Sequence, residues 1–118
     1  MALNNGSYEI KVNKIKKTVN LYVSGTAKPE AIEDFLKEYN STVNSIQVSE
    51  FDLVADGQEM SVETPENVQQ LVEIMKMYQH SGFKNVIIQV ASSNAILKMQ
   101  LKRIIRNSGA DNIKFLEV

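Results

Sequence analysis

The sequence predicts an α/β domain in which a single-layer mixed sheet of about five strands packs against about three helices. Apolar side chains recur at every second residue in some segments, as in strands, and at three- and four-residue steps in others, as in helices. The segments follow one another in the order β-β-α-β-α-β-α-β along 118 residues, a length typical of one domain with one core. We therefore expect a single domain over 1–118, with residues 1–6 flexible.

Two alternating segments open the chain and predict an antiparallel hairpin. They span 7–13 and 17–25 and are separated by a short lysine-rich connection. In each, apolar residues occupy one face and polar residues the other. The apolar sets are Tyr8, Ile10 and Val12 in the first segment and Val19, Leu21 and Val23 in the second. One polar face suits a sheet edge or a solvent-facing side.

Helical and strand segments alternate after Gly25. The expected helices span 28–46, 64–81 and 92–109, and the expected strands span 50–56, 83–91 and 112–118. Strands joined through helices lie parallel, with the helices packed on the sheet. Because the segments 50–56 and 83–91 are mainly apolar, we expect both to be central strands covered on both faces.

Composition argues against several classes of protein. The 13 basic and 14 acidic side chains leave a net charge of −1, without the basic excess of nucleic-acid-binding proteins. No cysteine is present, which removes thiolate nucleophiles and cysteine-bound metals. No apolar run approaches the roughly 20 residues of a membrane-spanning helix, and the first ten residues lack a secretory pattern. We expect a cytoplasmic protein that binds neither nucleic acid nor membranes.

Catalytic and cofactor motifs are also missing from the sequence. His80 is the only histidine, and no arrangement of serine and aspartate singles it out as part of a catalytic triad. The glycines are isolated and do not follow the spacing of a nucleotide-binding loop. We therefore expect a protein that is not an enzyme and that carries no cofactor and no metal.

Three stretches carry a resemblance to a known family. NLYVSGTA (20–27) is a strand ending in glycine before a helix, and FDLVADGQEM (51–60) is a strand containing Asp56. The segment from His80 to Val118 reads glycine, strand, short loop, helix, glycine, strand. Together they resemble the STAS domain, the fold of bacterial anti-sigma factor antagonists and of sulfate-transporter tails, over Tyr8 to Val118. The resemblance implies a regulatory or scaffold module of bacteria that binds a protein partner.

The motif that carries the switch in that family is degenerate in this chain. Antagonists have Asp-Ser-Ser/Thr-Gly at the start of the second helix, where a partner kinase phosphorylates the serine. If Asp56 aligns with the family's strand-end aspartate, the acceptor position is Pro65, which has no hydroxyl. A shift of one residue puts Thr64 at the acceptor position and Glu63 at that of the aspartate. The resemblance therefore implies a binding surface around 56–67 and the second helix, without the usual phosphoacceptor serine.

Thr64 has two interpretations. Threonine followed by Pro65 and Glu66 is typical of a helix N-cap, with proline at the first helical position and negative charge in the first turn. Thr64 could instead be a phosphoacceptor, because a phosphate is stabilised by free N–H groups at a helix start. The nearby carboxylates would oppose that phosphate, and we favour the cap.

The joint between the third strand and the second helix is acidic, and we expect a protein partner to bind there. The expected partner-binding residues are Asp56, Glu59, Glu63, Thr64, Glu66 and Asn67. Two alternatives are a site for a hard cation such as Mg²⁺ or Ca²⁺, and fixed negative charge that imitates a phosphorylated state. A different class of function, a small-molecule or lipid-binding domain, would require an apolar cavity of more than about 300 Å³ beneath the second helix.

The third helix carries a basic face. It consists of Lys98, Lys102, Arg103 and Arg106, three of which are spaced four residues apart. Such a face is either simply solvated or a docking surface for an acidic partner. Since the first helix is acidic, the asymmetry of charge also suits a homodimer.

Overall fold

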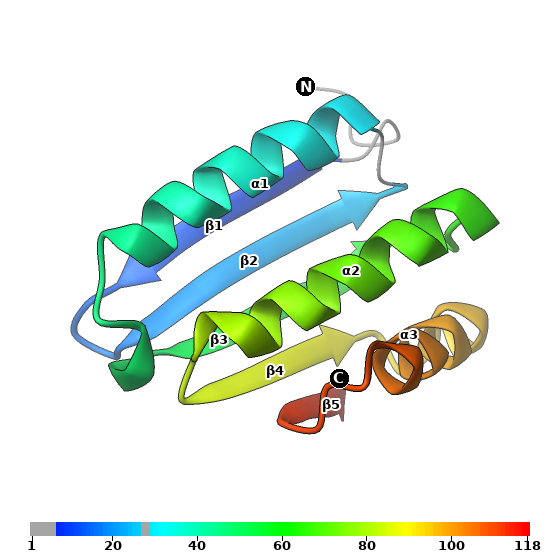
Figure 1. Cartoon of the computed structure of the whole chain (residues 1–118). Helices are drawn as coiled ribbons and strands as arrows, with labels where there is room; N and C mark the ends of the chain where they lie inside the picture. Colours follow the sequence, from blue (N-terminus) through cyan, green and yellow to red (C-terminus); the bar gives the residue numbers. More distant parts are fainter. Residues whose placement is uncertain (1–6, 27–28) are drawn as a thin grey trace.

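A computed structural model describes residues 7–26 and 29–118, which form one five-stranded sheet with three α-helices (Figure 1). The expected fold class and element order are confirmed, whereas the expectation for residues 1–6 lies outside the described residues. The elements are β1 (Ser7–Asn13), β2 (Thr18–Gly25), α1 (Pro29–Asn44), the short 3-10 helix η2 (Val48–Glu50), β3 (Asp52–Met60), α2 (Pro65–Ser81), β4 (Asn85–Val90), α3 (Ala95–Ser108) and β5 (Ile113–Glu117).

The strands follow one another across the sheet in the order of the sequence, β1-β2-β3-β4-β5. β1 and β2 pair antiparallel, which confirms the hairpin, and all other neighbours are parallel. The hairpin turn is held by Asn13, whose Oδ1 accepts hydrogen bonds from the N–H groups of Ile15 and Lys16. Lys17 completes the turn with a left-handed φ of 58°.

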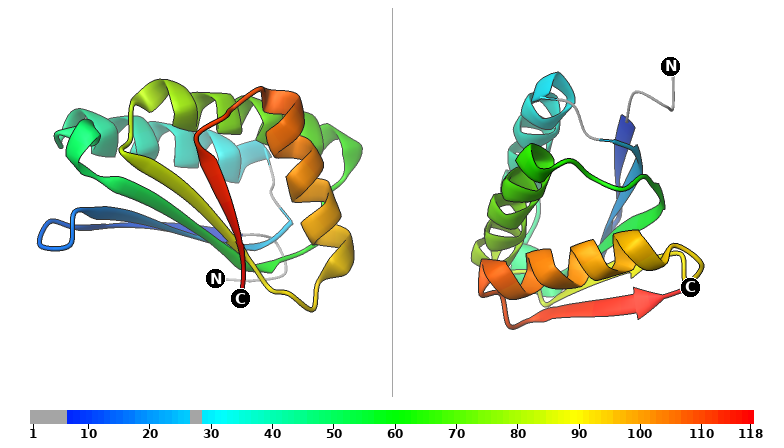
Figure 2. Two further views of the ribbon diagram at one scale, coloured as in Figure 1. Left: turned by 90° about the horizontal axis from the view of Figure 1, so that it is seen from below. Right: turned by 90° about the vertical axis from the view of Figure 1, so that its right-hand side faces the viewer.

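All three helices cover the same face of the sheet (Figure 2). Each crossover joins a strand to its next neighbour in the same direction, and right-handed crossovers of that kind place every helix on one side. In the described residues no helix covers the opposite face, which we call the outer face. The expectation that the strands around 50–56 and 83–91 are covered on both faces is therefore wrong.

Side-chain burial alternates along the central strands, as expected for a sheet that is covered by helices on one face only. In β3, Leu53 is buried while Val54 is only partly buried, and in β4, Val86 is buried while Ile87 is only partly buried. Val54 and Ile87 are cross-strand neighbours on the outer face. Because Val54 and Ile87 are aliphatic, both segments appeared to be buried on two faces. Only every second residue of each strand enters the core.

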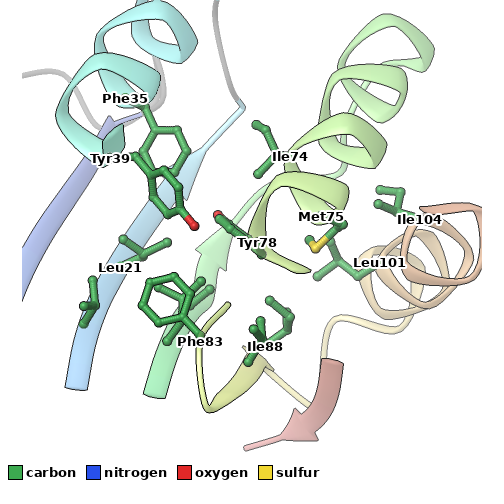
Figure 3. Close-up of a cluster of buried hydrophobic side chains, with 14 of the residues drawn as sticks. Leu21, Phe35, Tyr39, Ile74, Met75, Tyr78, Phe83, Ile88, Leu101 and Ile104 are labelled. Atoms are coloured by element: carbon green, nitrogen blue, oxygen red, sulfur yellow. The ribbon is translucent and has the colours of Figure 1, made fainter. Parts of the chain in front are cut away.

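The core lies between the inner face of the sheet and the three helices, and aromatic rings occupy one part of it (Figure 3). The ring of Tyr39 lies 5.7 Å from that of Phe35, 5.6 Å from that of Tyr78 and 6.4 Å from that of Phe83, measured between centroids. The Tyr39 hydroxyl shares a 2.7 Å hydrogen bond with that of Ser81. This bond fixes the end of α2 against α1.

β3 is longer than expected and loses one of its two neighbouring strands partway. Tyr22 of β2 is paired with Asp56, but Ser24 is paired with Glu59, so β3 contains one extra residue at this point. Pairing of β3 with β4 ends at Asp56, while pairing with β2 continues to Met60. The segment 57–60, which was expected to belong to a loop, is therefore a strand that has separated from β4.

Gly57 lies at this bulge in a space too small for a side chain. A Cβ atom there would come within 2.9 Å of Met60 Sδ and 3.2 Å of the backbone oxygen of Gln89. Gly57→Ala is expected to destabilise the protein by about 1–3 kcal/mol, because either Met60 or the β4 backbone must move. Urea unfolding measures the loss, with Gln58→Ala, on the exposed neighbour in β3, as the control.

Adding Met60→Ala to Gly57→Ala shows whether the loss of stability comes from contact with Met60 or from contact with the β4 backbone. If Met60 Sδ is the main obstruction, the double variant loses less than the sum of the two single losses. Wild-type stability in the Gly57→Ala protein would contradict the close packing described at the bulge.

Burial raises the pKa of Tyr39 to about 12 and outweighs the hydrogen bond with Ser81, which acts in the opposite direction. Between pH 10 and pH 12 the unfolded chain loses the Tyr39 proton while the folded protein keeps it, so stability falls as the pH rises. Urea unfolding at a series of pH values above 9 is expected to show a shallower decline in Tyr39→Phe than in the wild type. Equal slopes would show that Tyr39 does not resist ionisation in the folded state.

Candidate functional site

Asp56 and Glu59 lie at an open groove at the carboxyl end of β2 and β3. The groove has a volume of about 410 Å³. It is lined by Tyr8, Glu9, Tyr22, Val23, Ser24, Asp56, Gln58 and Glu59. Asp56 Oδ1 accepts a 3.0 Å hydrogen bond from the N–H of Gln58, which orients the carboxylate at the bulge. Glu59 is exposed, and Tyr22 exposes 43% of its surface.

Thr64 caps α2. Its Oγ1 accepts a 3.3 Å hydrogen bond from the N–H of Asn67, and its backbone oxygen accepts one of 2.9 Å from Val68. Thr64 has extended backbone angles, Pro65 follows at the first helical position, and Glu66 is exposed in the first turn. The capping interpretation is thus confirmed. Gly82, with a φ of 87°, ends the same helix as its C-cap.

Glu63 is buried, with only 4% of its surface exposed. It was expected to bind a partner, but in this structure its side chain is not accessible to one. The backbone of Glu63 is joined to α3 by two hydrogen bonds: its N–H donates to Gln100 Oε1 at 2.9 Å, and Gln100 Nε2 donates to its backbone oxygen at 3.0 Å. Asn94 Nδ2 also donates, at 3.5 Å, to the backbone oxygen of Met60.

Gln100 and Asn94 therefore hold the connection between β3 and α2 against α3. Asn94 had a signal in the sequence, because it stands directly before the helix it caps, where its Oδ1 accepts from the N–H of Leu97. Nothing in the sequence indicated the role of Gln100, since its partner, Glu63, is 37 residues away in the chain.

The carboxylates of the joint do not converge. Asp56 and Glu59 lie at the groove, Glu63 is buried, and Glu66 stands on the first turn of α2. Across residues 7–26 and 29–118, no group of three or more acidic or histidine side chains is placed to hold a metal ion. The residues that the sequence predicted to bind a partner thus lie at two different places: Asp56 and Glu59 at the groove on the sheet, and Thr64 and Glu66 at the start of α2.

The four residues of the basic face of α3 have two different environments. Lys98 is partly buried and pairs with Glu117 of β5 at 3.0 Å, which lowers the pKa of the Glu117 carboxyl. Lys102 Nζ stands 5.5 Å from the centroid of the Phe115 ring. Both lysines therefore connect α3 to β5, whereas Arg103 and Arg106 are exposed to solvent.

An apolar cavity of about 80 Å³ lies between the helices and the sheet. Its lining includes Ile74 and Met75 of α2, Phe35 of α1, Ile88 of β4 and Leu101 of α3. This volume is well below the roughly 300 Å³ at which small-molecule sites begin. None of the helices in the described part of the chain has the length and apolar character needed to span a membrane.

The Thr64 cap can be tested by stability. Thr64→Ala is expected to cost about 1 kcal/mol of unfolding free energy, because the N–H of Asn67 loses its acceptor, whereas Thr64→Ser keeps it. Urea unfolding of the three proteins measures the difference. If Thr64→Ala were as stable as Thr64→Ser, the cap would contribute nothing.

Comparison with known proteins identifies the fold. The sequence matches no protein-family model and no curated protein. Its structure is similar to the crystal structure of an uncharacterized protein from the DUF3478 family, with a SpoIIAA-like fold, from Shewanella loihica PV-4. The two share 17% sequence identity with a TM-score of 0.70, and the match covers 100% of this chain and 92% of that one. The chain therefore has the SpoIIAA-like, or STAS, fold that its sequence resembles.

Proposed function

We propose that this chain is a non-enzymatic regulatory or scaffold module that binds a protein partner at the groove of β2 and β3. The observation that carries the proposal is the difference between the groove on the sheet and the apolar cavity beneath the helices. The open groove, of about 410 Å³, is lined by charged and aromatic side chains, whereas the cavity beneath the helices, of about 80 Å³, is apolar and too small for a typical ligand. Small-molecule sites enclose their ligand and are mostly apolar, whereas this groove is open and charged, which favours a protein segment over a small molecule or lipid.

The groove favours a partner segment with positive charge. Asp56 and Glu59 supply two carboxylates, and Glu9 adds a third whose charge is partly offset by Lys11, 3.6 Å away. Tyr22 offers an exposed ring on which an arginine or lysine side chain can rest. Complementary charge of this kind guides association and selects the partner.

The proposal does not require phosphorylation. The hydroxyl of Thr64 is occupied as a cap, and Glu66 follows two residues later. A phosphate on Thr64 would stand beside that carboxylate, and like charges oppose each other. We therefore expect the partner to bind the unmodified chain, unlike the phosphorylation-switched antagonists that the fold resembles. Because a fold alone does not define a function, the resemblance supports only the class of activity.

Replacing the groove carboxylates tests the proposal. The Asp56→Asn/Glu59→Gln double variant removes two charges but keeps an oxygen to accept from the Gln58 N–H. In affinity purification from the native cell, with quantitative mass spectrometry, the variant is expected to recover a specific partner at least about tenfold less well than the wild type.

Glu73→Gln is the matched control, because Glu73 is an exposed carboxylate on α2 and does not line the groove. It should retain the same partner at the wild-type level. Equal recovery by all three proteins would contradict binding at the groove. A small molecule that copurifies in native mass spectrometry would instead support the ligand-binding class.

A further inference from the structure

The solvent side of α3 carries two exposed aliphatic side chains in line with two arginines. Ile96 is 64% exposed and Met99 is 63% exposed. Together with Arg103 and Arg106 they are spaced by three, four and three residues, which places all four on one face of a helix. We call this set the α3 stripe: its first half is apolar and its second half is cationic.

The helix beneath the stripe is firmly held. On its opposite side, Leu97, Leu101 and Ile104 are almost fully buried in the core. Asn94 caps its start, and Gly109, with a φ of 73°, ends it. The stripe is therefore a preformed helical surface, so a partner that binds it need not order the helix first.

One further exposed apolar side chain precedes α2. Val62 is 44% exposed in the connection before α2. The next residue, Glu63, is hydrogen-bonded through its backbone to Gln100, one turn along α3 from Ile96. Scattered apolar residues are normal on a surface, but Ile96 and Met99, one turn apart on the same helix face as two arginines, form a contact site of defined chemistry.

We propose that the α3 stripe docks an amphipathic helix of a protein partner that carries both apolar side chains and carboxylates. The apolar half would receive aliphatic residues at helical spacing, and Arg103 and Arg106 would each pair with a carboxylate. None of the ion pairs found in the described residues engages either arginine. The charge of the stripe thus selects an acidic partner, in contrast to the basic partner expected at the groove.

A second copy of this chain fits the stripe less well. Its acidic helix α1 exposes Glu33, Asp34 and Glu38, which would complement the arginines. However, the apolar residues Ile32 and Phe35 of α1 are buried in its own core, so Ile96 and Met99 would remain uncovered. A partner with an apolar stripe of its own satisfies both halves of the surface.

A lipid surface is also less suitable. Helices that lie in a membrane interface carry tryptophan, phenylalanine or leucine on the buried face. The α3 stripe has only Ile96 and Met99, without an aromatic side chain. The observations therefore favour a protein helix over a membrane.

A synthetic peptide probes the surface directly. The probe is an amphipathic helix with leucines at i, i+3, i+4 and i+7 and glutamates beside them, and its counterpart has lysine in place of every glutamate. Titration followed by backbone amide NMR is expected to show saturable shifts centred on the α3 stripe with the acidic peptide only. Met99→Ser and Arg103→Glu should each weaken binding by at least about fivefold, while Lys16→Glu, on the exposed hairpin, should not.

Each other outcome overturns the proposal. No saturable shifts up to millimolar peptide, shifts centred elsewhere, or equal binding of the lysine peptide would refute an acidic helix as the occupant. Sedimentation with phosphatidylglycerol vesicles that Met99→Ser abolishes would assign the stripe to a membrane. Self-association that Arg103→Glu abolishes in analytical ultracentrifugation would assign it to a second copy. Circular dichroism and urea unfolding of every variant exclude loss of folding as the cause.

Discussion

The placement of all three helices on one side of the sheet is the constraint on which the rest of the structure depends. Each crossover moves one strand further in the same direction, so right-handed connections cannot put a helix on the other side. One core forms, between the inner face and the helices, and it uses only alternate residues of each strand. The outer face of β1 to β5 remains without a covering helix in the described residues. Parallel sheets are normally covered on both faces, which makes this surface unusual.

The second feature that shapes the surface is the separation of β3 from β4 after Asp56. The bulge at Gly57 lets β3 continue along β2 while the end of β4 turns towards α3. Asp56 and Glu59 line the groove, whereas the Glu63 side chain is buried. The acidic stretch of the sequence is thus divided into a pair of carboxylates at the groove and a buried residue.

The periodic patterns were sufficient to predict the element order, the hairpin, and the helix ends at Thr64, Gly82 and Gly109, because these depend on local sequence. They were not sufficient to predict which strand faces are covered. Val54 and Ile87 are aliphatic but lie on the outer face, and an apolar residue does not reveal whether anything packs against it. The bonds between the Glu63 backbone and Gln100 were equally hidden, since the two residues are 37 apart in the chain. The residues predicted to bind a partner therefore do not share a common surface in the structure.

The one-sided sheet is tested most directly by the solvent exposure of methyl groups on its two faces. A soluble paramagnetic probe broadens the NMR signals of methyl groups that solvent reaches. The structure predicts strong broadening for Val54 and Ile87 on the outer face and little for Leu53 and Ile88, which enter the core. Equal protection of all four would contradict the account, because it would mean that the outer face is covered.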